Sequence, residues 1–296
     1  MRTYSILVGV VVVWGLVGGP VLASNEGSTD ESIFARDNLV AWCIVPFDPI
    51  NRTPLQRAEM LERLGIRRMA YDWREQHVPT FEDEILAYKK HEIEYFAFWG
   101  WHPAMASLIQ KHDIRPQIWT TFGAPATGTQ EERVSAAGKA LIPLVDQVRL
   151  LDCRLALYNH GGWSGEPANM VAVCRWLREN TQADHVGIVY NLHHGHDHIS
   201  DFAEVLALMK PYLLCLNLNG MNTDAKPKIL PLGKGEHDQR MLEIIRRSGY
   251  RGPIGILDHR SDVDAEQSLR ENLEGLKRLL HEMGDQKALK TFMNSR

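Results

Sequence analysis

The chain lacks three features that would have placed it in other classes of protein. It has no excess of basic residues, since its formal net charge is −4, which argues against nucleic acid as the main partner. Beyond Ala23 no apolar run is long enough to cross a membrane. No glycine-rich phosphate turn follows the first expected strand, which disfavours a doubly wound nucleotide-binding sheet.

Cysteine is scarce, with four residues in 296. Cys43 and Cys215 fall within apolar strand-like runs, Cys153 leads into another, and Cys174 lies in an expected helix. Their spacing matches no metal motif. Because a chain of this size can build a core without crosslinks, we expect buried free thiols, and disulfide bonds are the alternative.

The N-terminus has the layout of a secretory signal peptide. Arg2 supplies the positive start, the run 7–17 is apolar, and Val21-Leu22-Ala23 ends in small residues. We therefore expect cleavage after Ala23 and export to the periplasm or the extracellular space; a retained N-terminal anchor is the alternative. Residues 24–36 are expected to be a flexible lead-in, 37–284 the folded domain and 285–296 a C-terminal tail.

Short apolar runs alternate with longer amphipathic ones along the rest of the chain. The longer runs carry helix signals, such as Thr53-Pro54 at one start, Gly65 at its end, Thr80 before a second helix, and Thr129 with Glu132 as a capping box. The apolar runs suit strands buried on both faces. They are Leu39–Ile44, Arg68–Tyr71, Ile93–Trp99, Arg115–Thr120, Arg154–Tyr158, Val186–Tyr190, Leu213–Leu218 and Pro253–Leu257.

Eight strands that alternate with about as many helices predict an α/β fold, the (β/α)8 TIM barrel. In such a barrel the functional groups lie where strands end. Polar and aromatic residues follow most of the expected strands here. They are Asp72, Trp99, His102, Tyr158, Asn159, His160, Asn191, His194, Asn217, Asn219 and Asp258.

Several segments, in order, resemble a known family. They are LALYNHGG, VGIVYNLHHGH, ILPLGKGEHD and SGYRGPIGILDH, and together they are similar to the xylose isomerase-like sugar phosphate isomerase/epimerase barrels. The resemblance covers about Asn38 to Leu280. It implies a sugar substrate and a divalent metal (Mn²⁺, Mg²⁺ or Zn²⁺) that polarises a carbonyl while acid–base groups move a proton.

The resemblance also implies four metal ligands, which this chain largely replaces. The corresponding positions carry Tyr158 or Asn159, Asn191, Asn217 and Asp258, so only Asp258 keeps a carboxylate. Neutral amides bind hard cations weakly. Three alternatives follow: a site rebuilt from histidines for a softer ion such as Zn²⁺, with His160, His193, His194, His196 and His198 available; a sugar site without metal; or a pocket that has lost catalysis.

These residues are assigned provisional roles. The expected catalytic groups are His160, His194, Glu236 and Asp258, with Asp258 also the remaining metal ligand. The expected substrate-binding residues are Asp72, Trp99, His102, Tyr158, Asn159, Asn191, Asn217, Asn219 and Lys234. Glu236 and Lys234 lie in the glycine-containing turn after the seventh strand, where the backbone can approach a ligand.

The sequence thus favours a sugar isomerase or epimerase that transfers a proton beside a carbonyl. Export favours a free or glycosidic sugar, possibly oxidised, over a phosphorylated one. A lyase acting on keto-sugar derivatives and a non-catalytic carbohydrate-binding barrel are the alternatives. Nothing basic tracks a phosphate backbone, so the nuclease branch of the family is disfavoured. The oligomeric state is open.

Overall fold

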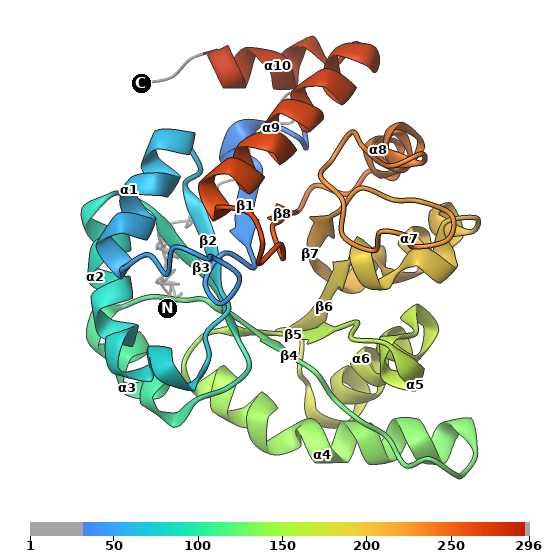
Figure 1. Ribbon diagram of the computed structural model, residues 1–296. Coiled ribbons are helices and arrows are strands. Elements are labelled where there is room, and N and C mark those ends of the chain that lie inside the picture. Colours follow the sequence, from blue (N-terminus) through green and yellow to red (C-terminus); the bar gives the residue numbers. More distant parts are fainter. Residues whose placement is uncertain (1–31, 294–296) are drawn as a thin grey trace, which may run out of the picture. The chain divides into compact units, whose positions relative to one another are not determined.

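Parallel strands form a closed barrel in the computed structural model, which describes residues 32–293. Each strand pairs with the next along the chain, and β8 returns to pair with β1. Helices surround the barrel on its outside (Figure 1). The fold within these residues is the (β/α)8 TIM barrel that the alternation predicted. The expected signal peptide lies outside the described residues.

All eight predicted strands are present among residues 32–293, with ends that differ from the prediction by at most two residues. Their bounds are β1 Leu39–Trp42, β2 Arg68–Tyr71, β3 Glu94–Trp99, β4 Gln117–Thr120, β5 Arg154–Tyr158, β6 Val186–Asn191, β7 Leu213–Leu218 and β8 Ile254–Leu257. The strands are short and apolar because both of their faces are covered. Register shifts occur between β2 and β3 and between β6 and β7.

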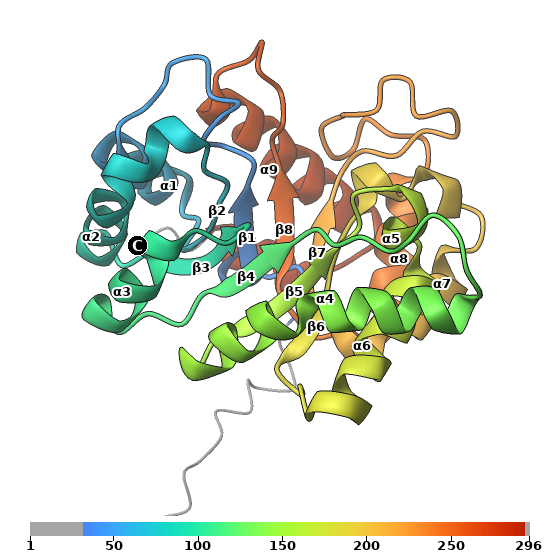
Figure 2. The same ribbon diagram turned by 90° about the horizontal axis from the view of Figure 1, so that it is seen from below.

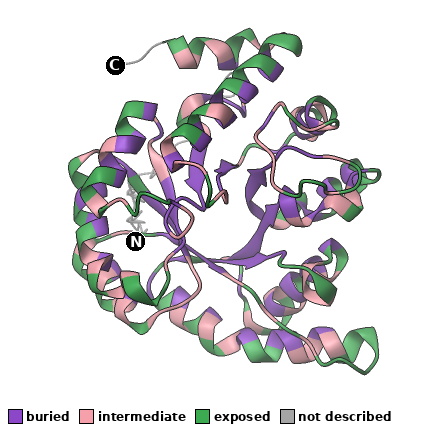
Figure 3. Ribbon diagram, viewed as in Figure 1, coloured by how far each residue is buried: buried purple, intermediate pink, exposed green. Residues whose placement is uncertain are grey.

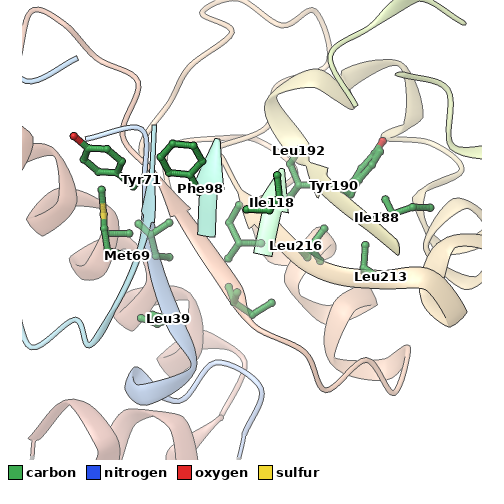
Figure 4. Packing of buried hydrophobic residues seen from close by; sticks show 14 of the residues in the cluster. Leu39, Met69, Tyr71, Phe98, Ile118, Ile188, Tyr190, Leu192, Leu213 and Leu216 are labelled. Atoms are coloured by element: carbon green, nitrogen blue, oxygen red, sulfur yellow. The ribbon is translucent and has the colours of Figure 1, made fainter. Parts of the chain in front are cut away.

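Side chains of the strands alternate between two hydrophobic layers, as the pleat requires. In β1, Leu39 belongs to the layer between barrel and helices, whereas Val40 and Trp42 belong to the barrel interior. Figure 4 shows the outer layer, with Met69 and Ile188 among its members. The four cysteines are buried and free, which confirms that prediction.

The helices begin and end largely at the residues that the sequence marked. The capping box of Thr129 and the left-handed Gly65 at the end of the first helix are both present. Thr80 precedes α2, but its hydroxyl donates to the His77 carbonyl instead of capping the helix. The helices are α1 Pro54–Leu64, α2 Phe81–Lys90, α3 Pro103–His112, α4 Gln130–Leu150, α5 Gly162–Gly165, α6 Pro167–Thr181, α7 Phe202–Met209, α8 Asp238–Arg247, α9 Ala265–Glu282 and α10 Gln286–Met293.

Short 3₁₀ turns complete the chain between these elements: η1 Arg36–Asn38, η2 Glu75–Thr80, η3 Leu192–His194, η4 His196–His198 and η5 Lys210–Tyr212. Burial follows the layers, since the strands are buried and the outer helix faces are exposed (Figure 3). Within the described part of the chain, no helix is both long and apolar enough to cross a bilayer.

Ordered structure extends beyond the expected domain bounds of 37 and 284. Ile33 and Phe34, placed in the lead-in, are buried in the core, and the expected tail contains α10. The two ends are joined, because the Ser32 hydroxyl donates to Asp285 at 2.7 Å and the Arg36 amide donates to the Thr291 hydroxyl at 2.9 Å. Residues on both sides of the expected domain thus contact each other and the core within the described part of the chain.

Candidate active site

The loops after β1, β7 and β8 rise on the side of the barrel toward which the strands point (Figure 2). Aromatic side chains fill the barrel interior beneath this opening. The Trp42 ring, at the end of β1, has its centroid 4.8 Å from that of Trp119, 5.6 Å from Trp99 and 6.1 Å from Tyr158. Because protein interiors are closely packed, these rings form an apolar floor at the C-terminal end of the barrel.

A small cavity of about 70 Å³ lies on this floor. It is enclosed by the first residues after several strands, as expected for a barrel mouth. Polar, sulfur-containing and aromatic groups all reach it. The lining residues are Trp42, Cys43, Phe47, Asp72, Arg74, Trp99, Tyr158, His160, His193, His194 and His259.

Four histidines cluster around the cavity. The ring centroids of His193 and His194 are 3.6 Å apart, those of His160 and His194 are 4.8 Å apart, and those of His193 and His259 are 5.4 Å apart. Burial, reinforced by the neighbouring Lys228 and imidazoles, lowers the pKa of His194 to about 3. Burial likewise lowers the pKa of His193 and of His259. These three rings are therefore neutral at pH 7.

Asp72 brings a carboxyl group in its acid form to the same cavity. Its side chain is buried, and one oxygen accepts a hydrogen bond from the Val45 amide at 3.3 Å. Burial raises the pKa of Asp72 to about 8, although Arg74 acts in the opposite direction. Burial, together with the nearby Asp72, also raises the pKa of the Cys43 thiol. At neutral pH both groups hold their protons.

Two residues at the cavity have left-handed backbone conformations that favour glycine. Cys43 has φ +61° and His259 has φ +52°. The two follow adjacent strands, and the His259 amide donates to the Cys43 carbonyl at 3.4 Å. Such conformations cost about 1–3 kcal/mol each and persist where the surroundings impose them. They direct the thiol and one imidazole to the cavity.

Asn191 and Asn159, both expected to bind substrate, lie in the wall between β5 and β6. The Asn191 amide nitrogen donates to the Tyr158 hydroxyl at 2.6 Å. Asn159 bonds twice to the Asn191 backbone, accepting from its N–H at 2.8 Å and donating to its carbonyl at 3.0 Å. Both asparagines are fully buried and neither lines the cavity, whereas Tyr158 does.

Asn217 and Asn219 are likewise buried. The Asn217 oxygen accepts a weak bond from the Cys215 thiol and packs against the backbone of Gly255, where a Cβ would collide with it. Asn219 holds the β7–α8 loop: its amide donates to the Lys228 carbonyl at 2.9 Å, and its oxygen accepts from the Leu230 amide at 3.3 Å. The contacts of Asn219 therefore fix the backbone of the β7–α8 loop.

The other predicted residues lie outside the cavity lining. Asp258 is buried, and burial raises its pKa to about 7 while the Ser268 hydroxyl and Arg260 act in the opposite direction. His102 caps α3 by accepting the Ala104 amide at 3.2 Å. Glu236 and Lys234 lie at exposed positions of the turn before α8. The Gly233 and Gly235 amides of this turn donate to the side chain of Asp238.

The residues at the four expected metal-ligand positions offer few of the donor groups that a divalent metal ion prefers. The four positions that the resemblance assigns to metal ligands supply one carboxyl, two amides and a phenol. The Asn191 nitrogen donates to the Tyr158 hydroxyl and the Asn217 oxygen accepts from the Cys215 thiol, whereas the Asn191 oxygen has no hydrogen-bond partner within the described residues. Among residues 32–293, no three His, Cys, Asp or Glu side chains are placed to share a metal ion. The described residues do not fit a hard cation at this position.

The sequence reasoning did not assign a site role to several residues that line the cavity. They are Trp42, Cys43, Phe47, Arg74 and His259. Cys43 directly follows β1 and His259 is the second residue after β8, so the strand-end rule could have found them. Arg74 and Phe47 lie two or more residues into loops, and sequence position does not say which way a loop side chain points.

No family model matches the sequence, and no curated protein matches it significantly. Solved structures do match. A 3-keto-D-glucoside 4-epimerase from E. coli superposes with a TM-score of 0.61 at 13% identity, over 81% of this chain and 99% of its own. A protein named IOLI with a bound zinc atom gives 0.62 at 13% identity, over 82% and 98%.

A D-psicose 3-epimerase, solved in the presence of D-fructose, gives a TM-score of 0.59 at 13% identity, over 83% of this chain and 99% of its own. Other matches are named as xylose isomerase domain proteins. This chain has the fold of the xylose isomerase-like barrels. At such low identity the likeness concerns the fold, so function has to be argued from the site.

Proposed function

We propose that this chain is a sugar isomerase or epimerase that moves a proton beside a carbonyl with its own side chains. The observation that carries the proposal is a cavity that combines neutral imidazoles with a protonated carboxyl. Such a proton transfer requires an acceptor for the proton and an acid that still holds its own, and both kinds of group reach this cavity. The names of two structural neighbours, both sugar epimerases, support the same class.

His160 is the group that we assign as the base. It lies at the exposed edge of the histidine cluster, so its imidazolium can remain hydrated after it accepts a proton. His193 is almost fully buried and is a poor site for a positive charge. His194 lies beside the His160 ring, with the two centroids 4.8 Å apart.

Asp72 is the matching acid. Because its carboxyl is protonated at neutral pH, it can donate to a carbonyl or hydroxyl oxygen as negative charge develops there. Trp99 and Tyr158, whose rings are 4.5 Å apart, offer apolar surface to the face of a sugar ring. None of these steps uses a tightly bound metal ion.

Export of the chain is part of the proposal, and it favours a free or glycosidic sugar. Arg2, the apolar run 7–17 and the small residues ending at Ala23 support it. Mass determination of the N-terminus after secretion checks the expected cleavage, which should leave Ser24 as the first residue.

Deuterium exchange tests the chemistry directly. Chelator-treated protein in D₂O should replace the proton beside the carbonyl of a ketohexose or keto-glycoside, as followed by NMR. We expect His160→Gln to slow this exchange by about 10²–10⁴-fold, the usual contribution of general base catalysis. His198→Gln is the matched control, because His198 contacts Glu166 and Asp201 outside the cavity.

Three outcomes separate the alternatives. Exchange that appears only after a divalent ion is added contradicts the proposal and restores a metal enzyme. Formation of an unsaturated product identifies a lyase. Binding of sugars with no exchange on any of them identifies a non-catalytic carbohydrate-binding barrel.

A further inference from the structure

The cavity combines a cationic side chain, that of Arg74, with a carboxyl group, that of Asp72, which holds its proton at neutral pH. Arg74 lies in its lining, with its guanidinium carbon 5.7 Å from the centre of the Phe47 ring. That side chain donates to the Trp73 carbonyl at 2.7 Å and to the Asp72 carbonyl at 3.4 Å. Within residues 32–293 no carboxylate lies within ion-pair distance of Arg74. Its charge is held at the rim without a partner.

Lys228, on the β7–α8 loop, is a second cation that has no ion-pair partner among residues 32–293. Asn219 fixes the backbone there by donating to the Lys228 carbonyl, and the adjacent Ile229 packs against the interior cluster that contains Trp42 and Trp99. The loop is thereby held against the mouth of the barrel. The Lys228 side chain is exposed, and its charge is close enough to lower the pKa of His194.

Carboxylates near the mouth balance these two cations only in part. Asp48 and Asp264 are both paired with Arg52, and Glu271 is paired with Arg260. Asp258 is only partly ionised at neutral pH, since burial raises its pKa to about 7. Asp224, on the same loop as Lys228, accepts the Lys226 amide at 3.0 Å and keeps its charge, but no ion pair joins it to Lys228 within the described residues. Asp72, the carboxyl inside the cavity, holds its proton at neutral pH.

His193 gives an independent indication that a polar ligand belongs here. Its ring is 2% exposed, lines the cavity, and has no hydrogen-bond partner at either nitrogen within the described residues. Buried polar groups are normally satisfied, and leaving one unpaired costs about 1–3 kcal/mol. A ligand oxygen in the cavity would satisfy this ring.

We propose that the sugar carries a carboxylate group, which Arg74 and Lys228 hold at the rim of the cavity. The inference rests on the proposed function, since it names the substrate class of that same site. The planar guanidinium offers paired donors to the oxygens of the anion, and the ammonium adds a point charge. The neutral end of the sugar then reaches the histidines.

Equilibrium binding by calorimetry tests this proposal with three probes: D-glucose, D-glucuronate and D-glucose 6-phosphate. We expect D-glucuronate to bind about tenfold or more tightly than glucose at low salt, and high salt to reduce the preference. Arg74→Gln and Lys228→Gln should each reduce that preference by about tenfold. Tighter binding of D-glucose 6-phosphate than of D-glucuronate would contradict a carboxylate.

Lys139→Gln is the control, because it removes the same charge from an exposed position on α4. Equal binding of glucose and both anions contradicts the inference, as does a preference that survives Arg74→Gln and Lys228→Gln together. Deuterium exchange on neutral sugars alone would keep the proposed function and also reject the anionic substrate. Selective anion binding without exchange would reject the proposed catalysis while supporting the anion site.

Discussion

At the scale of single residues, burial sets the protonation states at the barrel mouth. Asp72 accepts a hydrogen bond from the Val45 amide and lies in the cavity among aromatic rings, imidazoles and the Arg74 guanidinium. Removal from water disfavours its charged form, so its pKa rises to about 8 from an ordinary value of 3.8. His194 shifts in the opposite direction for the same reason. A single cause thus yields a weak acid and neutral imidazoles side by side.

This shift of Asp72 predicts a pH dependence of stability. Between its unfolded and folded pKa values the folded chain binds a proton that the unfolded chain has lost, so stability falls as pH rises toward about 8 and then levels. Asp72→Asn removes this loss of stability at high pH, because the amide side chain does not titrate. We expect the melting temperature of the variant, minus that of the wild type, to increase from about pH 5 to about pH 9.

Thermal unfolding at several pH values measures that difference. The opposite contribution of His194, whose lowered pKa favours folding as pH rises, is common to both proteins and cancels. A difference in melting temperature that stays constant across the range would show that Asp72 ionises normally in the folded chain.

At the scale of secondary-structure elements, buried asparagine side chains form hydrogen bonds between the ends of neighbouring strands. Asn159 replaces a ladder hydrogen-bond pair by binding both the N–H and the carbonyl of Asn191, so the end of β5 is fixed against the end of β6. This contact positions Tyr158 and His160, which flank Asn159 and line the cavity. The amide acts on the site through the backbone.

Asn159→Ala should therefore destabilise the barrel. Two buried backbone groups lose their partners, at a cost of about 1–3 kcal/mol in the free energy of unfolding. Urea unfolding measures this cost. Asn180→Ala is the control, because Asn180 makes its one bond at an exposed position on α6 and should change stability by less than about 0.5 kcal/mol. Equal effects of the two variants would contradict the structural role.

The sequence predicted the secondary-structure elements more completely than the residues of the candidate site. The strands were predictable because residues such as Val186 and Leu213 lie in apolar runs that suit strands covered on both faces. Strand ends marked Tyr158, His160 and His194 as mouth residues, and the structure brings these together. The same rule also marked Asn159 and Asn219, because a polar residue at a strand end serves equally well to face a ligand or to bind backbone.

At the scale of the whole molecule, the two ends of the described chain close on each other. Ser32 bonds to Asp285, just before α10, Arg36 bonds to Thr291 within it, and Ala288 is the buried residue of that helix. The barrel itself closes where β8 pairs with β1, and α10 contacts η1, which leads into β1, and α9, which packs against β8. The last helix is therefore expected to contribute to the stability of the barrel.

Deletion of residues 285–296 tests that contribution. Loss of two tertiary hydrogen bonds and of the buried face of α10 should remove about 2–3 kcal/mol, which lowers the melting temperature by about 4–10 °C in a chain of this size. Scanning calorimetry measures the shift. An unchanged melting temperature would mean that α10 is dispensable, as the sequence expectation of a tail implied.

The aromatic floor also makes the site accessible to optical spectroscopy. Trp42 and Trp99 border the cavity, and their indoles lie within 5.6 Å of each other. Trp42 is also 4.8 Å from Trp119, so the three chromophores are close enough to couple electronically. Any ligand that settles on this surface changes the polarity around two emitting rings. The barrel mouth thus carries a built-in fluorescence and circular-dichroism reporter, which needs no attached label.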